Sequence, residues 1–204
     1  MSETISRRRI LALAVPALVS LAADPVLSLV DTAFVGRLGA GPLAALGVDV
    51  AIFGFVFALF NFLAYATTPL VAQARGRGEI AESGRIVQRA LALALGIGVV
   101  SVAAMVVGAS FLVELMGAGP DFAHDAVAYL TIRAFALPAL LIITAANGAY
   151  RGFQDTRTPL LVTLAVNGLN MALDPILMFD FGLGLGLEGA AWATVIAQWI
   201  GAAV

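Results

Sequence analysis

Residues 90–115 read ALALALGIGVVSVAAMVVGASFLVEL, a stretch in which Glu114 is the one charged side chain. A helix rises about 1.5 Å per residue, so roughly 20 apolar residues cross the ~30 Å of hydrocarbon in a bilayer. The stretch therefore predicts a transmembrane helix. The whole chain of 204 residues is 61% hydrophobic and 12% charged, whereas soluble domains carry about 25% charged residues. This composition predicts an integral, multi-pass membrane protein.

Comparable apolar segments lie on both sides of this stretch. The approximate spans are Ile10 to Val35, Leu43 to Gln73, Ala90 to Leu115, Val127 to Tyr150 and Leu160 to Phe181, and a sixth opens near Gly189 and reaches Val204. No long linker divides them, so we expect residues 1–204 to form one all-α membrane lobe of six helices. These segments are too long and too many for a signal peptide, and we expect no cleaved leader. The short sixth span predicts that the sequence belongs to a longer chain.

The arginines predict the orientation of the lobe, because arginines in short loops stay on the cytoplasmic side. All 11 basic residues are arginine, and all but Arg37 and Arg133 lie before the first span or in alternate loops. These are Arg7, Arg8 and Arg9, then Arg75, Arg77, Arg85 and Arg89, then Arg151 and Arg157. The other loops hold Arg37, then Asp121, His124 and Asp125, then Asp180 and Glu188. We therefore expect a cytoplasmic N-terminus in a cell membrane.

The first predicted span contains two carboxylates, Asp24 and Asp31. Seven residues separate them, so at 100° per residue both face nearly the same side of a helix. If the hydrocarbon begins near Ile10, Asp24 lies roughly 21 Å and Asp31 roughly 31 Å along the helix. A charge in hydrocarbon is costly and usually marks function, so Asp31 is a candidate ion site, with an interfacial helix end as the alternative. Asp24 precedes Pro25 and is either a structural cap or an ion ligand.

The fifth predicted span carries Asn167, Asn170 and Asp174, which form one polar stripe on an apolar helix. By the rise of a helix, Asp174 reaches a depth near that of Asp24, so the two helices are candidates for a shared site. The alternative is a polar ladder that holds helices together, which fits Asn167 better than Asp174. Pro175 follows Asp174, and the repeated Asp-Pro step predicts two broken helices that meet near the midplane.

Three further polar residues lie inside predicted spans. Arg133 is placed near the outer end of the fourth span, where it either pairs with a carboxylate or extends to the interface. Asn61 in the second span and Thr194 in the sixth are weaker candidates, because such side chains often hydrogen-bond across helices without a transport role. Asn61, Arg133 and Asn167 are candidates for the substrate path.

No enzyme site is evident. His124 is a lone histidine in an acidic loop, which predicts a solvated side chain rather than a metal ligand or base. Residues 182–187, GLGLGL, lack the context of a dinucleotide-binding fingerprint and predict a turn. The chain has no cysteine and no lysine. We expect no cofactor, no nucleic-acid partner and no metal beyond a coupling Na⁺.

Four pieces of the chain, in register across the six spans, resemble the multidrug and toxic compound extrusion (MATE) transporters. They are Pro16 followed by residues 30–39 (VDTAFVGRLG) and 43–47 (LAALG); residues 147–159 (NGAYRGFQDTRTP); residues 170–174 (NMALD); and residues 189–194 (GAAWAT). The resemblance implies the first lobe of a twelve-helix transporter whose second lobe is missing here. It also implies a cation-coupled antiporter that exports organic compounds by alternating access, with H⁺ or Na⁺ as the coupling ion.

The combination of Asp31, Asn170 and Asp174 is similar to the DinF subgroup of that family. By that resemblance these residues and Thr194 would bind the coupling cation. Asp24-Pro25 resembles a plant-type branch that includes citrate exporters, so the implied substrates are amphiphilic cations or carboxylates such as citrate. Pro16 and Pro25 are the candidate bending points of the first helix.

Two alternatives to an antiporter stay open. One is a flippase for lipid-linked precursors from the same superfamily, which is expected to have a more cationic interior. The other is a non-transporting membrane scaffold subunit whose polar residues only join helices.

Overall fold

The computed structural model describes Val15, Leu18, Pro25 and residues 28–204, and this part of the chain is helical with short turns and no strands. Residues 28–36 are helical. They are followed by α2 (Ala40–Phe60), α3 (Phe62–Gly76), α4 (Ile80–Leu115), α5 (Pro120–Ala134), α6 (Leu137–Gly152), α7 (Arg157–Met178) and α8 (Gly186–Ala203). This architecture confirms the predicted all-α fold. The predictions for Arg7, Arg8, Arg9, Pro16 and Asp24 lie outside the described residues.

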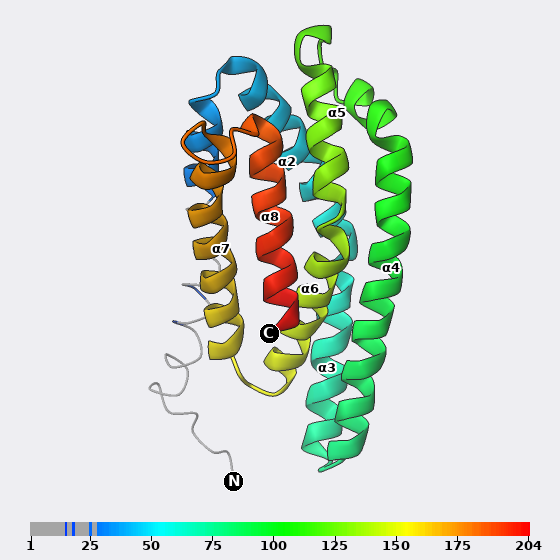
Figure 1. Cartoon of the computed structure of the whole chain (residues 1–204). Helices are drawn as coiled ribbons and strands as arrows, with labels where there is room; N and C mark the ends of the chain where they lie inside the picture. The colour runs from blue at the N-terminus through cyan, green and yellow to red at the C-terminus, as the bar shows by residue number, and fades with distance from the viewer. Residues whose placement is uncertain (1–14, 16–17, 19–24, 26–27) are drawn as a thin grey trace.

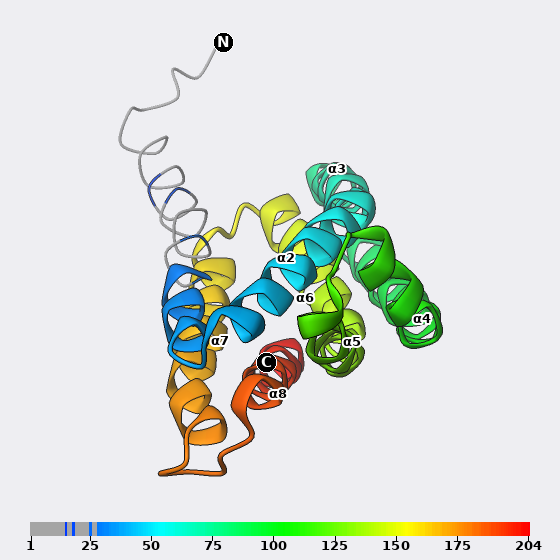
Figure 2. The same ribbon diagram turned by 90° about the horizontal axis from the view of Figure 1, so that it is seen from above.

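The helices stand side by side as a bundle in which α7, α8, the α5–α6 pair and α4 follow one another across the molecule (Figure 1). The second helix, α2, packs against α5, and α3 packs against both α4 and α6. Residues 28–36 lie beside α7 in both views (Figure 2). A buried core that includes Leu46, Met105 and Leu130 joins α2, α4 and α5.

Within the described residues, three helical stretches are long and apolar enough to cross a membrane: Ala40–Gly76, Ile80–Leu115 and Arg157–Met178. The pair of α5 and α6, which are bent by 50° relative to each other, meets the same criterion when the two helices are taken together. On the outside of α4, the side chains of Val107 and Phe111 are 88% and 66% exposed. An exposed apolar face of this kind is typical of a surface that lipid covers.

Two helices begin earlier than the apolar pattern predicts. The fourth helix, α4, begins at Ile80 rather than Ala90, and Arg85 within it is paired with Glu82 at 2.7 Å. Likewise α5 begins at Pro120 rather than Val127. Charged side chains lie along these first turns because the helices extend beyond the hydrocarbon. Residues there need not be apolar, so hydrophobicity does not reveal where the helices begin.

The predicted acidic loop at residues 121–125 is therefore the first turn of α5. Pro120 occupies a first-turn position of the helix and Asp121 follows it. Proline is favoured there because the missing N–H needs no partner, and a carboxylate is favoured by the helix dipole. His124 is exposed on this turn, as expected for a solvated side chain.

The connection between α6 and α7 is short, because α6 includes Asn147 and ends at Gly152. Asp155 then caps the start of α7: its Oδ1 accepts the backbone N–H groups of Arg157 and Thr158 at 2.9 and 3.1 Å. The Thr158 hydroxyl donates to Asp155 Oδ2 at 2.6 Å. The hydrogen bonds from Thr158 lower the pKa of the Asp155 carboxyl below its ordinary value. A carboxylate that satisfies free N–H groups stabilises a helix start.

The bend between α5 and α6 comes from Pro138, which lies in the first turn of α6 and cannot donate to the carbonyl four residues earlier. The freed backbone near the bend finds another partner: Trp199 of α8 donates its Nε1–H to the Phe135 carbonyl at 2.9 Å. Across the bend, Gly98 of α4 lies so close that an added Cβ would collide with Pro138. The bent span is thus held from both sides.

Replacing Trp199 with phenylalanine should destabilise the bend, because the ring stays while the hydrogen bond to Phe135 is lost. The expected loss is about 0.5–1.5 kcal/mol in the free energy of unfolding, measured on the purified protein in detergent. Trp192→Phe is the matched control, since Trp192 is on the same helix and 40% exposed. Equal losses in both variants would contradict this explanation of the bend.

Candidate functional site

Asp31 and Asp174 come from two neighbouring helices, and their carboxyl groups lie within hydrogen-bonding distance of each other. Asp174 is 1% exposed, and Asp31 is half-buried. Two ionised carboxylates have no proton to share and repel each other, so such a pair holds a proton or another cation between its oxygens. The geometry therefore makes this pair a candidate cation site.

Asn170 links this pair to α8. With its amide nitrogen toward Asp31, Nδ2 donates to both Asp31 carboxylate oxygens at 3.2 and 3.3 Å, and the amide oxygen accepts from the Thr194 hydroxyl at 3.2 Å. In the opposite orientation Nδ2 faces Asp174 Oδ1 at 3.4 Å and Thr194 Oγ1 at 3.2 Å. The first orientation pairs a donor with an acceptor on both sides, and we adopt it for that reason. Either way, the structure brings together Asp31, Asn170, Asp174 and Thr194.

The sequence predicts Asp174 near the depth of Asp24, which lies outside the described residues. In the structure Asp174 lies level with Asp31 instead, since α7 ends at Met178, one turn after Asp174. Residues 28–36 likewise end one turn beyond Asp31. The two carboxylates meet because both lie about one turn from the same end of their helices.

The prediction of a broken helix at the Asp174-Pro175 step is wrong. The seventh helix, α7, continues through Pro175 to Met178. A proline removes one hydrogen bond from the ladder, and a helix packed along its length tolerates that loss near its end. The bent span is the α5–α6 pair instead. Pro25 is helical and exposed, but its neighbours lie outside the described residues, so its bending stays a prediction.

Arg133 pairs with a carboxylate that the sequence analysis missed, Asp49 of α2. The Arg133 Nε–H donates to Asp49 Oδ2 at 3.4 Å, and the side chains are 15% and 2% exposed. The guanidinium group also stacks on the Phe53 ring, 4.5 Å from its centroid. Of the two interpretations of Arg133, the structure supports pairing over extension to the interface. The signal for Asp49 was present in the sequence: it is an ionisable residue in an apolar run, the same pattern that marked Asp31.

The ion pair and the carboxyl pair are neighbours. Arg133 is close enough to Asp31 and Asp174 to interact with both electrostatically. Tyr129, one turn before Arg133 on α5, is 4% exposed and interacts with Asp49 as well as with the carboxyl pair. Asp49 Oδ1 and Arg133 NH1 are buried and have no hydrogen-bond partner among the described residues.

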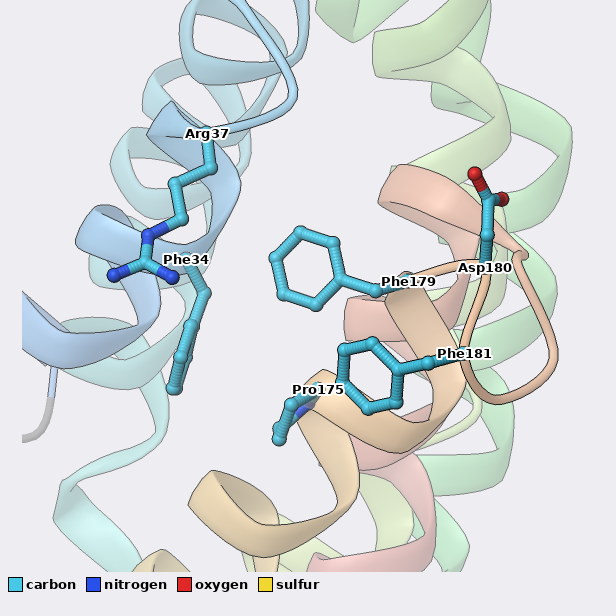
Figure 3. A pocket seen from close by; sticks show the side chains of 6 residues that line it. All are labelled: Phe34, Arg37, Pro175, Phe179, Asp180 and Phe181. Atoms are coloured by element: carbon cyan, nitrogen blue, oxygen red, sulfur yellow. The ribbon is translucent and has the colours of Figure 1, made fainter.

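A cavity of about 400 Å³ lies at the end of the helices next to the carboxyl pair. Phe34 and Arg37 line one side, and Pro175, Phe179, Asp180 and Phe181 line the other (Figure 3). The Phe179 ring lies between those of Phe34 and Phe181, with centroid distances of 6.4 and 5.9 Å. Neither Asp31 nor Asp174 lines this cavity, although Phe34 follows Asp31 by one turn and Pro175 follows Asp174 directly.

Two further candidate residues, Asn61 and Asn167, were predicted to line the substrate path. Asn61 marks the break between α2 and α3, where its carbonyl accepts the N–H groups of Ala64 and Tyr65 at 3.1 and 3.3 Å. Asn167 is half-buried one turn before Asn170 on α7. The described residues contain no group of three or more His, Asp or Glu that would hold a metal ion. The turn predicted at residues 182–187 is present, and it ends as α8 begins at Gly186.

The MatE family model matches residues 16–176 of the chain. Protein DETOXIFICATION 44, chloroplastic, of Arabidopsis thaliana is 42% identical over 203 residues, which cover 94% of this chain and 39% of that protein. DNA damage-inducible protein F of Escherichia coli (strain K12) is 33% identical over 197 residues, with 96% and 42% covered.

The fold has a counterpart among solved structures. An outward-facing multidrug resistance MATE family transporter of the MOP superfamily superposes with a TM-score of 0.87 at 27% identity, covering 95% of this chain and 43% of that one. The chain thus spans about two fifths of the length of these relatives. Its extent corresponds to one lobe of such a transporter.

Proposed function

The chain belongs to the MatE family, as its sequence resemblance predicted, and we propose that it is the N-terminal lobe of a cation-coupled antiporter that exports organic compounds. In this proposal Asp31, Asn170, Asp174 and Thr194 bind the coupling cation. A second lobe joins this one in the working transporter, and the substrate passes between the two or within them. The reaction is transport by alternating access rather than catalysis.

One observation carries the proposal: two carboxyl groups from separate helices lie within hydrogen-bonding distance of each other in an apolar bundle. Their carboxylate oxygens suit a proton or Na⁺, while the Asn170 amide nitrogen donates to Asp31 and the Thr194 hydroxyl donates to the amide oxygen, so both hold the pair in place. Intramembrane carboxylates that pair with each other typically mark ion pathways.

The coupling follows from differential affinity. A cation shifts the balance between inward-open and outward-open states only if it binds one state more tightly than the other. The carboxyl pair meets this requirement if the helix of residues 28–36 moves relative to α7, because such a movement separates Asp31 from Asp174. In our proposal the cation therefore favours the state in which the two helices stay together.

Several finer points belong to the proposal. The coupling ion is H⁺ or Na⁺, and the substrate is an amphiphilic cation or a small carboxylate such as citrate. The N-terminus is on the cytoplasmic side of the membrane, in line with the distribution of arginines. Asp24 is a further ligand of the coupling ion, and Pro16 and Pro25 are the points at which the first predicted span bends.

The two alternatives have less support. A flippase is expected to have a more cationic interior, but Arg133, the arginine that lies within the described bundle, is already paired with Asp49. A scaffold subunit does not require carboxylates to approach each other, since amide and hydroxyl groups join membrane helices at lower cost.

Replacing Asp31 with asparagine tests the proposal. The protein, with its second lobe, is reconstituted into vesicles, and efflux of a fluorescent dye or of citrate is measured under an imposed H⁺ or Na⁺ gradient. We expect Asp31→Asn to lower gradient-driven efflux to the rate of protein-free vesicles, because an amide cannot bind and release a proton or neutralise a cation.

Asp125→Asn is the matched control, since it makes the same chemical change on the exposed side of α5. It should leave the driven rate unchanged. Gradient-driven efflux that persists in Asp31→Asn would remove the proposed cation site, whereas the absence of driven efflux in the unmodified protein, with every substrate and both gradients, would remove the antiporter itself.

A further inference from the structure

The Asp49–Arg133 ion pair has no role in the cation site as described so far, yet it lies beside that site. Its charges come from α2 and α5, whereas those of the carboxyl pair come from residues 28–36 and α7. An ion pair within an apolar bundle is costly unless its geometry is good and its remaining atoms are satisfied. Here the geometry is poor, which calls for an explanation other than stability.

The bond between Arg133 and Asp49 is long and incomplete. At 3.4 Å it exceeds the length of about 2.7–2.9 Å that is typical of charge-assisted hydrogen bonds. A guanidinium group has five N–H donors, arranged to match a carboxylate with two parallel bonds. Arg133 uses one donor, and its buried NH1 is left without a partner among the described residues. Asp49 therefore holds Arg133 weakly.

A second pair of carboxylates is within electrostatic reach of the same guanidinium group. Arg133 attracts both Asp31 and Asp174, and its guanidinium group lies over the Phe53 ring, a contact that does not fix the direction of its N–H groups. With one proton shared between Asp31 and Asp174, those groups, Asp49 and Arg133 carry a net charge of −1. The cluster is thus neutral when it holds one further monovalent cation.

We propose that Arg133 is an internal competitor of the coupling cation. It pairs with Asp49 while the cation occupies the carboxyl pair, and it turns its free N–H groups toward Asp31 and Asp174 when the cation leaves. The inference rests on the proposed function, because it requires that those two residues bind the cation. Asp49 then sets the cation affinity by holding Arg133 away from the site.

The consequence for transport concerns the emptied site. Two unpaired carboxylates in apolar surroundings cost several kcal/mol, and an arginine that turns toward them lowers this cost. The lobe then changes conformation without a cation in place, as an antiporter must do on the half-cycle that carries substrate. Arg133 assists this step at the expense of cation affinity.

The proposal predicts changes of opposite sign in two variants of the reconstituted two-lobe protein. Asp49→Asn releases Arg133 toward the carboxyl pair, so the half-saturating concentration of the driving cation, H⁺ or Na⁺, should rise. The double variant Asp49→Asn with Arg133→Gln removes the competitor, so that concentration should fall below the wild-type value. Each shift should be roughly 5- to 150-fold, the range of a typical coupling between sites. The double variant keeps a neutral hydrogen-bonding pair, which protects folding.

Arg89→Gln, on the exposed side of α4, is the matched control and should leave the half-saturating concentration unchanged. Shifts in the same direction, or no shift in the double variant, would overturn the role of Arg133. Asp31→Asn separates the two levels of inference. If Asp31→Asn abolishes driven efflux while Asp49→Asn and the double variant shift the half-saturating concentration in the same direction, this inference alone fails. If Asp31→Asn leaves driven efflux intact, the proposed function fails with it.

Discussion

Replacing Gly148 with leucine should prevent α3 and α6 from packing and leave little folded protein. A Cβ on Gly148 would lie 2.8 Å from both the Cα and the carbonyl oxygen of Ala64, and one on Gly152 would lie 2.8 Å from the Thr68 carbonyl oxygen. The Thr68 hydroxyl also donates to the Gly148 carbonyl at 2.9 Å. Two glycines one turn apart thus bring the helix backbones into contact, as small residues do in membranes.

The obstacle to a side chain is backbone, which cannot move aside without shifting α3. Overpacking by a single methyl group typically costs about 1–3 kcal/mol, so we expect a loss in that range for Gly148→Ala and a larger loss for Gly148→Leu. The measurements are the yield of monodisperse protein after extraction and its unfolding in detergent. Gly96→Ala and Gly96→Leu are the controls, because a Cβ on Gly96 meets nothing within 4 Å. Equal tolerance at both positions would contradict the close approach.

Replacing Arg133 with leucine should cost about 3–5 kcal/mol in the free energy of unfolding, because it leaves Asp49 as an uncompensated buried charge. Asp49 is 2% exposed, so water cannot reach the carboxylate. The loss should appear as a lower unfolding temperature in detergent.

The double variant Asp49→Leu with Arg133→Leu should recover most of that loss. Apolar residues of similar volume often replace a buried ion pair at little cost or even with a gain. This result would place the value of the pair in function rather than stability, because the double variant should fold while its cation dependence changes. A double variant as unstable as Arg133→Leu would instead show that the pair holds α2 and α5 together.

The sequence predicted the helical membrane fold because length and hydrophobicity are local properties. Any stretch like residues 90–115 has one stable arrangement in a bilayer, that of a helix whose backbone bonds are internal. The sequence predicted the ends of the helices less accurately. Both Ile80 and Pro120 begin helices outside the apolar runs, where the membrane no longer imposes a pattern.

The candidate site was partly predictable as well. Asp31 and Asp174 stand out because charges are rare in apolar runs, and the family resemblance pointed to Asn170 and Thr194 as their partners. Depth estimates along single helices did not reveal the contact, because the level at which two helices meet depends on how they pack. The same rule applies to Asp49, an ionisable residue in an apolar run, which the sequence analysis did not single out.

Local chemistry thus settled which segments are helices and which side chains are too costly to leave unpartnered in lipid. Pairing is a different matter, since a charge in a helix is compatible with any neighbour of opposite sign or with a shared proton. The approach of Asp31 to Asp174, the assignment of Arg133 to Asp49, and the contact of α3 with α6 at Gly148 all join residues far apart in the chain. Such contacts depend on the distances between packed helices, which no single segment contains.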